Sequence, residues 1–144
     1  MTDHYEASNP EHQAIRLGIE RGNGISNMVS RKEAHEAMQK AGFVVDYHGD
    51  LAARPDRKPW YAPLAGDVKS SRTLFEFLSS LRLTNVGRYG IGFLLRSLEA
   101  VGLAPSGTAR TAAELSTGAD ALVAGGREGL FTPMYLMIGK KPLV

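Results

Sequence analysis

The chain has 144 residues, of which 43% are hydrophobic and 22% charged, values near globular averages that exclude a disordered, collagen-like or coiled-coil chain. Seventeen basic and fifteen acidic residues leave a scattered net charge of +2, which argues against nucleic acid as a partner. Cysteine is absent, so disulfides, thiolate zinc sites and cysteine nucleophiles are excluded.

The first predicted element is a helix over residues 10–21. Asn9 is a favourable N-cap, Pro10 suits the first helical position and Gly22 suits the end. The next helix begins at a capping box, in which the side chains of Ser30 and Glu33 satisfy two free amides.

Gly42 is expected to end this second helix. Its apolar residues recur at helical spacing and are expected to face the core: Ala34, Ala37, Met38 and Ala41. Residues 43–48 follow, and their β-branched and aromatic side chains predict a strand. Residues 50–67 carry three prolines, so they predict a long loop of the kind that a compact domain keeps for function.

Three helices and one strand are predicted in the second half. Apolar residues recur at helical spacing over 74–81 and again over 91–101, and 85–87 predicts a tight turn that makes these two helices antiparallel. A second capping box, Thr111 with Glu114, predicts a helix that runs to Gly125 and Gly126. Its expected apolar stripe is Leu115, Leu122 and Val123. Residues 134–140 predict the closing strand.

Together these elements predict an α+β fold, a single domain of residues 1–144 in which about five helices pack against a short two-stranded antiparallel sheet. Two strands alone are marginal and leave ladder edges open, so we expect a homo-oligomer. The polar, acidic first residues lack the parts of a signal peptide, and no apolar run reaches the roughly 20 residues that span a bilayer. We expect a cytoplasmic protein without a transmembrane segment, compatible with a peripheral place on the endoplasmic reticulum.

Motifs for cofactors and metals are absent from the sequence. The glycine-rich stretches 22–24 and 87–92 contain neither GxGxxG nor a P-loop, and helix packing explains them better. The four histidines occur singly, without a two-histidine metal spacing, and no GxSxG elbow exists. We therefore expect no cofactor and no metal. His12 is interpreted as an exposed residue of a first helical turn, with a polar or proton-carrying role in a pocket as the alternative.

The most distinctive feature is the pair Trp60 and Tyr61, which stands between Pro59 and Pro63. Prolines reduce the freedom of the unfolded loop and hold large flat rings in place, so these rings are able to line an apolar pocket. The alternative is that Trp60 only fills the core under a long loop.

Several segments together resemble the C-terminal part of sterol 24-C-methyltransferases. The resemblance covers nearly the whole chain and is carried by MTD (1–3), EH (11–12), GNGI (22–25), DLA (50–52), PWY (59–61), PLAGD (63–67), GLAP (102–105), LVAGG (122–126) and LFTPM (130–134). In that family this region follows the core that binds the methyl donor S-adenosylmethionine, and it contributes the last strands and the helices that cover the lipid. The resemblance therefore implies a sterol methyltransferase C-terminal-like fold without the donor-binding core, which we expect here as a free-standing protein.

Two departures from the family pattern concern the aromatic residues. Asp56, Arg57 and Lys58 precede the Pro-Trp-Tyr stretch, where the family usually has an acidic pair and an apolar residue. A basic pair would not stabilise the cation formed on methylation. Ala62 replaces a family tyrosine, which opens space for a different ligand.

From the resemblance we expect an enzyme without a cofactor that binds an apolar terpenoid or sterol-like substrate and promotes a cyclisation or a Diels–Alder cycloaddition. Holding one reactive conformer lowers a barrier by up to roughly 7–11 kcal/mol. The expected polar helpers are Tyr61, Tyr89 and His12, and the expected substrate-binding residues are Trp60, Tyr61, Met28, Phe75 and Phe93. Core packing is the alternative for each helix aromatic. The alternative functions are a non-catalytic sterol or lipid binder, a regulatory partner of a sterol methyltransferase, and a truncated domain without activity.

Overall fold

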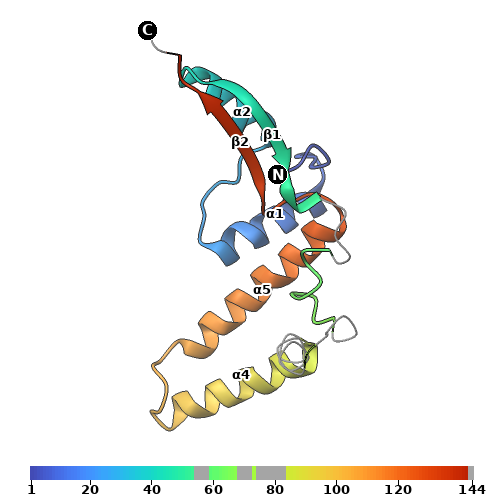
Figure 1. Ribbon diagram of the computed structural model, residues 1–144. Helices are drawn as coiled ribbons and strands as arrows, with labels where there is room; N and C mark the ends of the chain where they lie inside the picture. The colour runs from blue at the N-terminus through green and yellow to red at the C-terminus, as the bar shows by residue number, and fades with distance from the viewer. Residues whose placement is uncertain (54–58, 68–72, 74–83, 143–144) are drawn as a thin grey trace.

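The computed structural model describes residues 1–53, 59–67, 73 and 84–142 (Figure 1). In chain order the described elements are α1 (Pro10–Asn23), α2 (Arg31–Lys40), β1 (Val44–Asp50), the short 3-10 helix η1 (Leu51–Ala53), α4 (Asn85–Ala100), α5 (Thr108–Arg127) and β2 (Tyr135–Lys140). The α+β class and the two-stranded antiparallel sheet are confirmed. The described part contains four α-helices, and the helix predicted over 74–81 lies outside it.

Local chemistry sets the start of both early helices as predicted. The Asn9 side chain accepts the Glu11 N–H at 2.9 Å, which begins α1. The capping box of α2 is complete, because Ser30 Oγ accepts the Glu33 N–H at 3.1 Å and a Glu33 carboxylate oxygen accepts the Ser30 N–H at 2.7 Å. The predicted end of α1 is wrong by two residues, since Gly24 takes the left-handed conformation, with φ 65°, that closes the helix.

Two expectations about helix starts are wrong. Residues 85–87 form the first turn of α4 instead of a tight turn, because the Thr84 hydroxyl accepts the Gly87 N–H at 3.2 Å and caps the helix. Helix α5 begins at Thr108 after Gly107, three residues before the predicted capping box. Thr111 therefore lies inside α5, where its hydroxyl donates to the Gly107 carbonyl at 3.0 Å.

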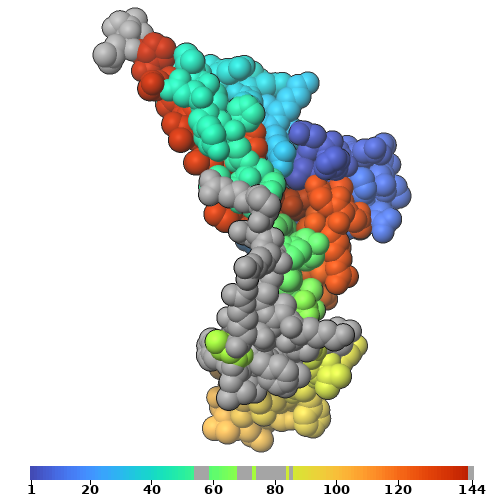
Figure 2. All heavy atoms as spheres, turned by 45° about the vertical axis from the view of Figure 1, so that its right-hand side comes forward, coloured from blue at the N-terminus to red at the C-terminus, as the bar shows by residue number. Residues whose placement is uncertain are grey.

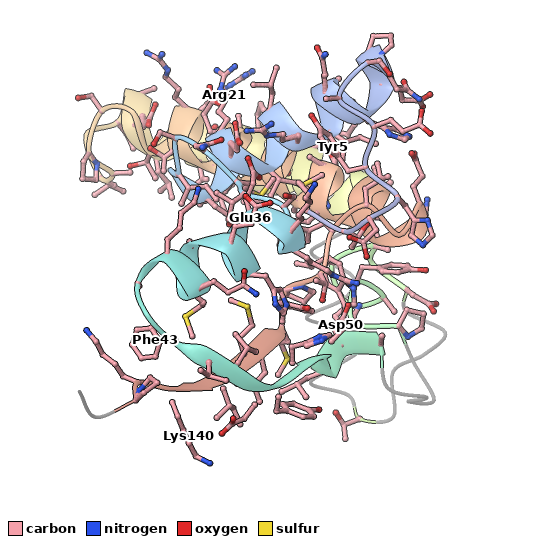
Figure 3. The ribbon with its side chains drawn as sticks, turned by 90° about the horizontal axis from the view of Figure 1, so that it is seen from above. Tyr5, Arg21, Glu36, Phe43, Asp50 and Lys140 are labelled. Carbon is pink, nitrogen blue, oxygen red and sulfur yellow. The ribbon has the colours of Figure 1, made fainter. Side chains whose placement is uncertain are left out.

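Strands β1 and β2 pair antiparallel in a register that runs from Val44 opposite Lys140 to Asp50 opposite Tyr135, with a bulge between Val45 and Tyr47. Seen from above, Phe43 and Lys140 lie at one end of the sheet and Asp50 at the other (Figure 3). The strand predicted over 43–48 thus extends two residues further and begins one residue later.

Helix α2 packs on one face of this sheet, with the Met38 side chain against Gly139. No residue of α2 is fully buried, so the core positions predicted for Ala37 and Ala41 are wrong, and both are exposed. No described element covers the opposite face of the sheet, which we call the uncovered face, and its apolar side chains are exposed: Val44, Tyr47, Leu136 and Ile138. This face is the largest departure from an ordinary two-layer domain.

The hydrophobic core lies between α1 and α5. Ile19 and Leu130 are 0% and 1% exposed, and Met1, Ile15 and Met28 complete the cluster. The two helices cross at Gly22 and Gly118, where a Cβ on Gly118 would stand 2.6 Å from the Gly22 Cα. The absence of side chains is therefore what allows this close approach.

A buried carboxylate stands at the edge of the core. One oxygen of Glu20 accepts the Met28 N–H at 2.7 Å and the Arg16 Nε–H at 2.8 Å. The hydrogen bond from the Met28 backbone, and then the Arg16 guanidinium, hold the pKa of Glu20 below its usual value. This bond ties the segment after α1 to the helix.

Two ends of the molecule extend away from the core. The sheet with α2 forms one end, and α4 forms the other beyond α5 (Figures 1 and 2). Among the described helices none is long and apolar enough to cross a membrane.

Candidate functional site

Residues 59–67 fold into successive turns, which we call the aromatic turn. The Ala62 N–H donates to the Pro59 carbonyl at 3.0 Å, and the Ala65 N–H donates to the Tyr61 carbonyl at 3.0 Å. The Trp60 ring stands edge-on to Tyr61, at 5.6 Å between centroids. Of the predicted loop 50–67, residues 54–58 lie outside the described residues, and the departure at Asp56–Lys58 lies there.

The aromatic turn packs on the last turn of α5. A Cβ on Gly126 would overlap the Tyr61 ring and would come 2.8 Å from Trp60 Cζ2. On its other side Trp60 meets Phe131 edge-on, at 5.8 Å between centroids. Both rings therefore pack directly on the backbone of Gly126, and both side chains remain partly exposed to solvent.

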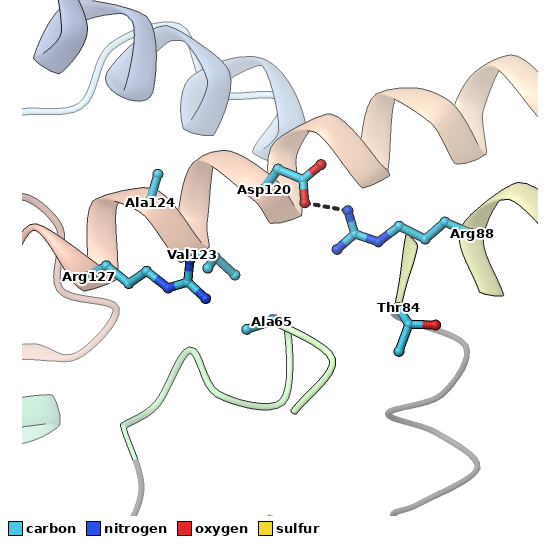
Figure 4. Close-up of a pocket in the computed structure, with 7 residues that line it drawn as sticks. All are labelled: Ala65, Thr84, Arg88, Asp120, Val123, Ala124 and Arg127. Carbon is cyan, nitrogen blue, oxygen red and sulfur yellow. Dashed lines mark hydrogen bonds and ion pairs between the residues drawn. The ribbon is translucent and has the colours of Figure 1, made fainter. Parts of the chain in front are cut away.

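A hollow of about 480 Å³ opens beside this turn. Three segments line it, as Figure 4 shows: the aromatic turn through Ala65, the start of α4 through Thr84 and Arg88, and α5 through Asp120, Val123, Ala124 and Arg127. Its size falls within the range of ligand pockets, roughly 300–1,000 Å³.

Charge at the hollow comes from one ion pair and one further cation. Arg88 pairs with Asp120 and also donates to the Leu64 carbonyl at 3.3 Å, so it fastens the aromatic turn to α4 and α5. Arg127 has no hydrogen bond or ion pair within the described residues. The hollow thus combines the aliphatic side chain of Val123 with guanidinium donors that suit an oxygen of a bound ligand.

The structure brings only some of the predicted site residues close together. Trp60 and Tyr61 lie together on the aromatic turn, against Gly126 and Phe131, and only Ala65 of that turn lines the hollow. Tyr89 and Phe93 lie on α4 and are 82% and 75% exposed. Phe75 lies outside the described residues.

Two further predicted residues belong to other surroundings. Met28 is buried in the core cluster. His12 accepts the Glu6 N–H on Nδ1 at 3.0 Å, and its Nε2 stands 3.9 Å from a Glu128 carboxylate oxygen. Neither lines the hollow, and their proposed roles toward a ligand stay predictions.

Sequence reasoning missed the charged residues of the hollow. Asp120, Ala124 and Arg127 follow each other at i, i+4 and i+7, so one helix face was readable from the sequence. Arg88 stood next to a segment interpreted as a turn, which hid its place on α4. The pairing of Arg88 with Asp120 joins residues far apart in the chain and had no local signal.

A second polar cluster stands between α2 and the sheet. The Tyr135 hydroxyl lies 3.0 Å from His35 Nε2 and 3.1 Å from His48 Nδ1. Arg31 pairs with Asp50 at 2.6 Å, and the Thr132 hydroxyl donates to the same carboxylate at 2.6 Å. These bonds join α2 to the sheet. Within the described residues no group of three or more metal-binding side chains occurs.

Comparison with known proteins connects this structure to one family. Residues 78–143 match the model of the sterol methyltransferase C-terminal family. The chain is 51% identical over 143 residues to a sterol 24-C-methyltransferase of Neurospora crassa, covering 99% of this chain and 38% of that protein. It is 50% identical over 142 residues to enzymes of that name from Gibberella zeae and Aspergillus fumigatus, covering 99% of this chain and 37% and 38% of those proteins.

The chain therefore spans less than two fifths of the length of these relatives. No solved structure gives a significant match to the chain.

Proposed function

Because the chain is homologous along its length to the C-terminal region of sterol 24-C-methyltransferases, we propose that it binds a sterol and acts as the partner of a methyltransferase core. The aromatic turn with its hollow would receive the sterol, and the two-stranded sheet would dock on the core. The observation that carries this proposal is the uncovered face of the sheet.

Docking through the sheet would bury exposed apolar side chains and also satisfy unpaired backbone groups at the strand edges. Apolar side chains at Tyr47 and Ile138 are exposed on the face that α2 leaves free. In the described residues each strand also pairs on one side only, so each has an open ladder edge. A neighbouring strand and a covering helix of a core would satisfy both the edge and the face.

Side chains of the aromatic turn and the hollow support the sterol part of the proposal. Trp60 and Tyr61 offer partly exposed flat apolar surface on the aromatic turn, and Val123 adds an aliphatic side chain inside the hollow. A sterol has one hydroxyl on a rigid apolar body, and Arg127 provides free N–H donors for such an oxygen.

Docking is tested by complementation. The Neurospora crassa relative, shortened by the region that this chain matches, would be mixed with this chain, S-adenosylmethionine and a sterol, and methylated sterol would be measured. We expect methylation to appear only in the mixture. The double variant Tyr47→Lys/Ile138→Lys should abolish it, whereas Leu17→Lys, on an exposed position of α1, should not. Failure of the mixture to associate or to methylate would contradict docking.

Sterol binding is tested without any core. Trp60 is the single tryptophan, so energy transfer from it to a fluorescent sterol such as dehydroergosterol reports on the aromatic turn itself. We expect saturable transfer that Trp60→Phe removes. Arg127→Ala should weaken binding by roughly a hydrogen bond to a charged group, about tenfold. Absence of transfer at every concentration would refute the sterol site and leave the docking test untouched.

A cyclisation or Diels–Alder reaction without a cofactor is the less favoured function. Such catalysis relies on an enclosed apolar cavity that holds one conformer. The hollow is bordered by Arg88, Asp120 and Arg127, and the comparisons do not support a Diels–Alderase. Incubation of the purified chain with polyene isoprenoids is expected to leave them unchanged. A new product would favour the cyclisation function over sterol binding with a methyltransferase core.

A further inference from the structure

Helix α4 has two different sides. Its inner side faces α5, where Arg88 pairs with Asp120. On its outer side Val86, Tyr89 and Phe93 occupy successive turns and are 82%, 82% and 75% exposed. The outer face, as we call it, consists of Val86, Tyr89, Phe93, Leu94, Val101 and Leu103. Exposed apolar side chains that gather on one helix commonly mark an interaction site.

The outer face also has a distinctive charge pattern. Between Val86 and Leu103 the sequence contains one carboxylate, Glu99. Its oxygen accepts the Ala109 N–H at 2.8 Å, so it is held at the start of α5. Arg96 on α4 and Arg110 on α5 are exposed and have no ion pair within the described part of the chain. The outer face is therefore apolar, and the exposed cation on its own helix is Arg96.

This combination is the one that bilayer surfaces recognise. A helix that lies in the interface buries aliphatic and aromatic side chains beneath the headgroups, while arginine side chains reach the lipid phosphates. Tyrosine is favoured at the depth where apolar chains meet polar headgroups. Tyr89, Phe93 and Arg96 lie within two turns of one another and supply each of these contacts.

A second copy of the chain fits the outer face less well. Stable protein interfaces use about 20–30 residues on each side, whereas the outer face has six. A second copy would also offer Arg96 no free carboxylate from its own outer face, because Glu99 is already held by the Ala109 N–H.

The place of α4 in the fold agrees with a bilayer partner. The helix forms the end of the molecule opposite the sheet, as Figures 1 and 2 show. A surface bound at the outer face would leave the sheet free. From these observations we infer that the outer face of α4 docks on a lipid bilayer, with Tyr89 and Phe93 inserted and Arg96 at the phosphates.

Vesicle binding tests this inference without sterol and without a methyltransferase core, so its outcome is independent of the proposed function. Purified chain would be sedimented with phosphatidylcholine vesicles, with and without phosphatidylserine, none of them containing sterol. We expect binding to both, tighter with phosphatidylserine. Tyr89→Ser and Phe93→Ser should each lower the partition coefficient about tenfold, because each removes an inserted ring. Arg96→Gln should lower it about fivefold, mainly with phosphatidylserine.

The matched control is Leu17→Ser on α1, which removes a leucine that is 62% exposed and lies outside the outer face. It should bind vesicles like the parent chain. All these positions are exposed, so the variants should keep the parent helix content by circular dichroism. The inference is overturned if the parent chain fails to sediment with vesicles or if Tyr89→Ser/Phe93→Ser binds as Leu17→Ser does. It is also overturned if light scattering finds a dimer that the double variant abolishes, since the occupant would then be a second copy.

Discussion

Substitution of Gly118 by alanine tests the close crossing of α1 and α5. A Cβ at this position would stand 2.6 Å from the Gly22 Cα, which is backbone and has no rotamer to change. Carbon atoms prefer a separation of about 3.5–4.0 Å, so the helices would have to part by about 1 Å. Overpacking of this kind costs about 1–3 kcal/mol. Alanine in a helix returns about 1 kcal/mol relative to glycine.

The expected net loss is about 0–2 kcal/mol, or up to roughly 8 °C in melting temperature for a chain of this size. Gly92→Ala on α4 is the matched control, because a Cβ there meets nothing within 4 Å. That variant should gain up to about 1 kcal/mol. Urea unfolding followed by circular dichroism measures both. If Gly118→Ala were as stable as Gly92→Ala, the crossing at Gly22 would not be as close as described.

Three further outcomes are expected. Gly126→Ala should displace the aromatic turn, because the new methyl group would overlap the Tyr61 ring. The fluorescence emission of Trp60 should then shift to longer wavelength. Unchanged emission would contradict the packing of the two rings on Gly126. Glu20→Gln should cost about 1–3 kcal/mol at pH 7. The pKa of Glu20 is depressed in the folded state, so the parent loses this advantage as the pH falls from about 4.3 through the folded pKa. Urea unfolding should therefore give free energies of unfolding for the two proteins that converge in acid. A difference that stays constant with pH would refute the ion pair and the backbone bond as its source. Leu130→Ala should cost about 2–5 kcal/mol because the side chain is 1% exposed, and a loss below 1 kcal/mol would place Leu130 outside the core.

The sequence predicted those parts of the fold that short-range chemistry determines. Asn9 and the box of Ser30 with Glu33 set helix starts because the side chain and the amide it caps are neighbours in the chain. The capping pattern at Thr111 gave a wrong helix start, because the chain already begins α5 after Gly107, which the spacing of Thr111 and Glu114 does not reveal. Local signals thus compete, and tertiary packing decides among them.

The candidate site was predictable in its aromatic half only. Trp60 and Tyr61 stand out between prolines, so the sequence draws attention to them. Their packing on Gly126 depends on the path of α5, and the bond between Arg88 and Asp120 spans 32 residues. Neither has a periodic or spacing signal, because each arises only when α4, α5 and the turn are assembled.

The pairing of β1 with β2 has a consequence for synthesis of the chain. Their partners lie about 90 residues apart, so the contact order of the sheet is high. At about 5–20 residues per second, β1 leaves the ribosome roughly 5–20 seconds before β2 exists. During that interval Val44 and Tyr47 stand on an unpaired strand with only α2 beside it. The nascent chain is then most exposed to aggregation, and a holding chaperone would act there before the last strand arrives.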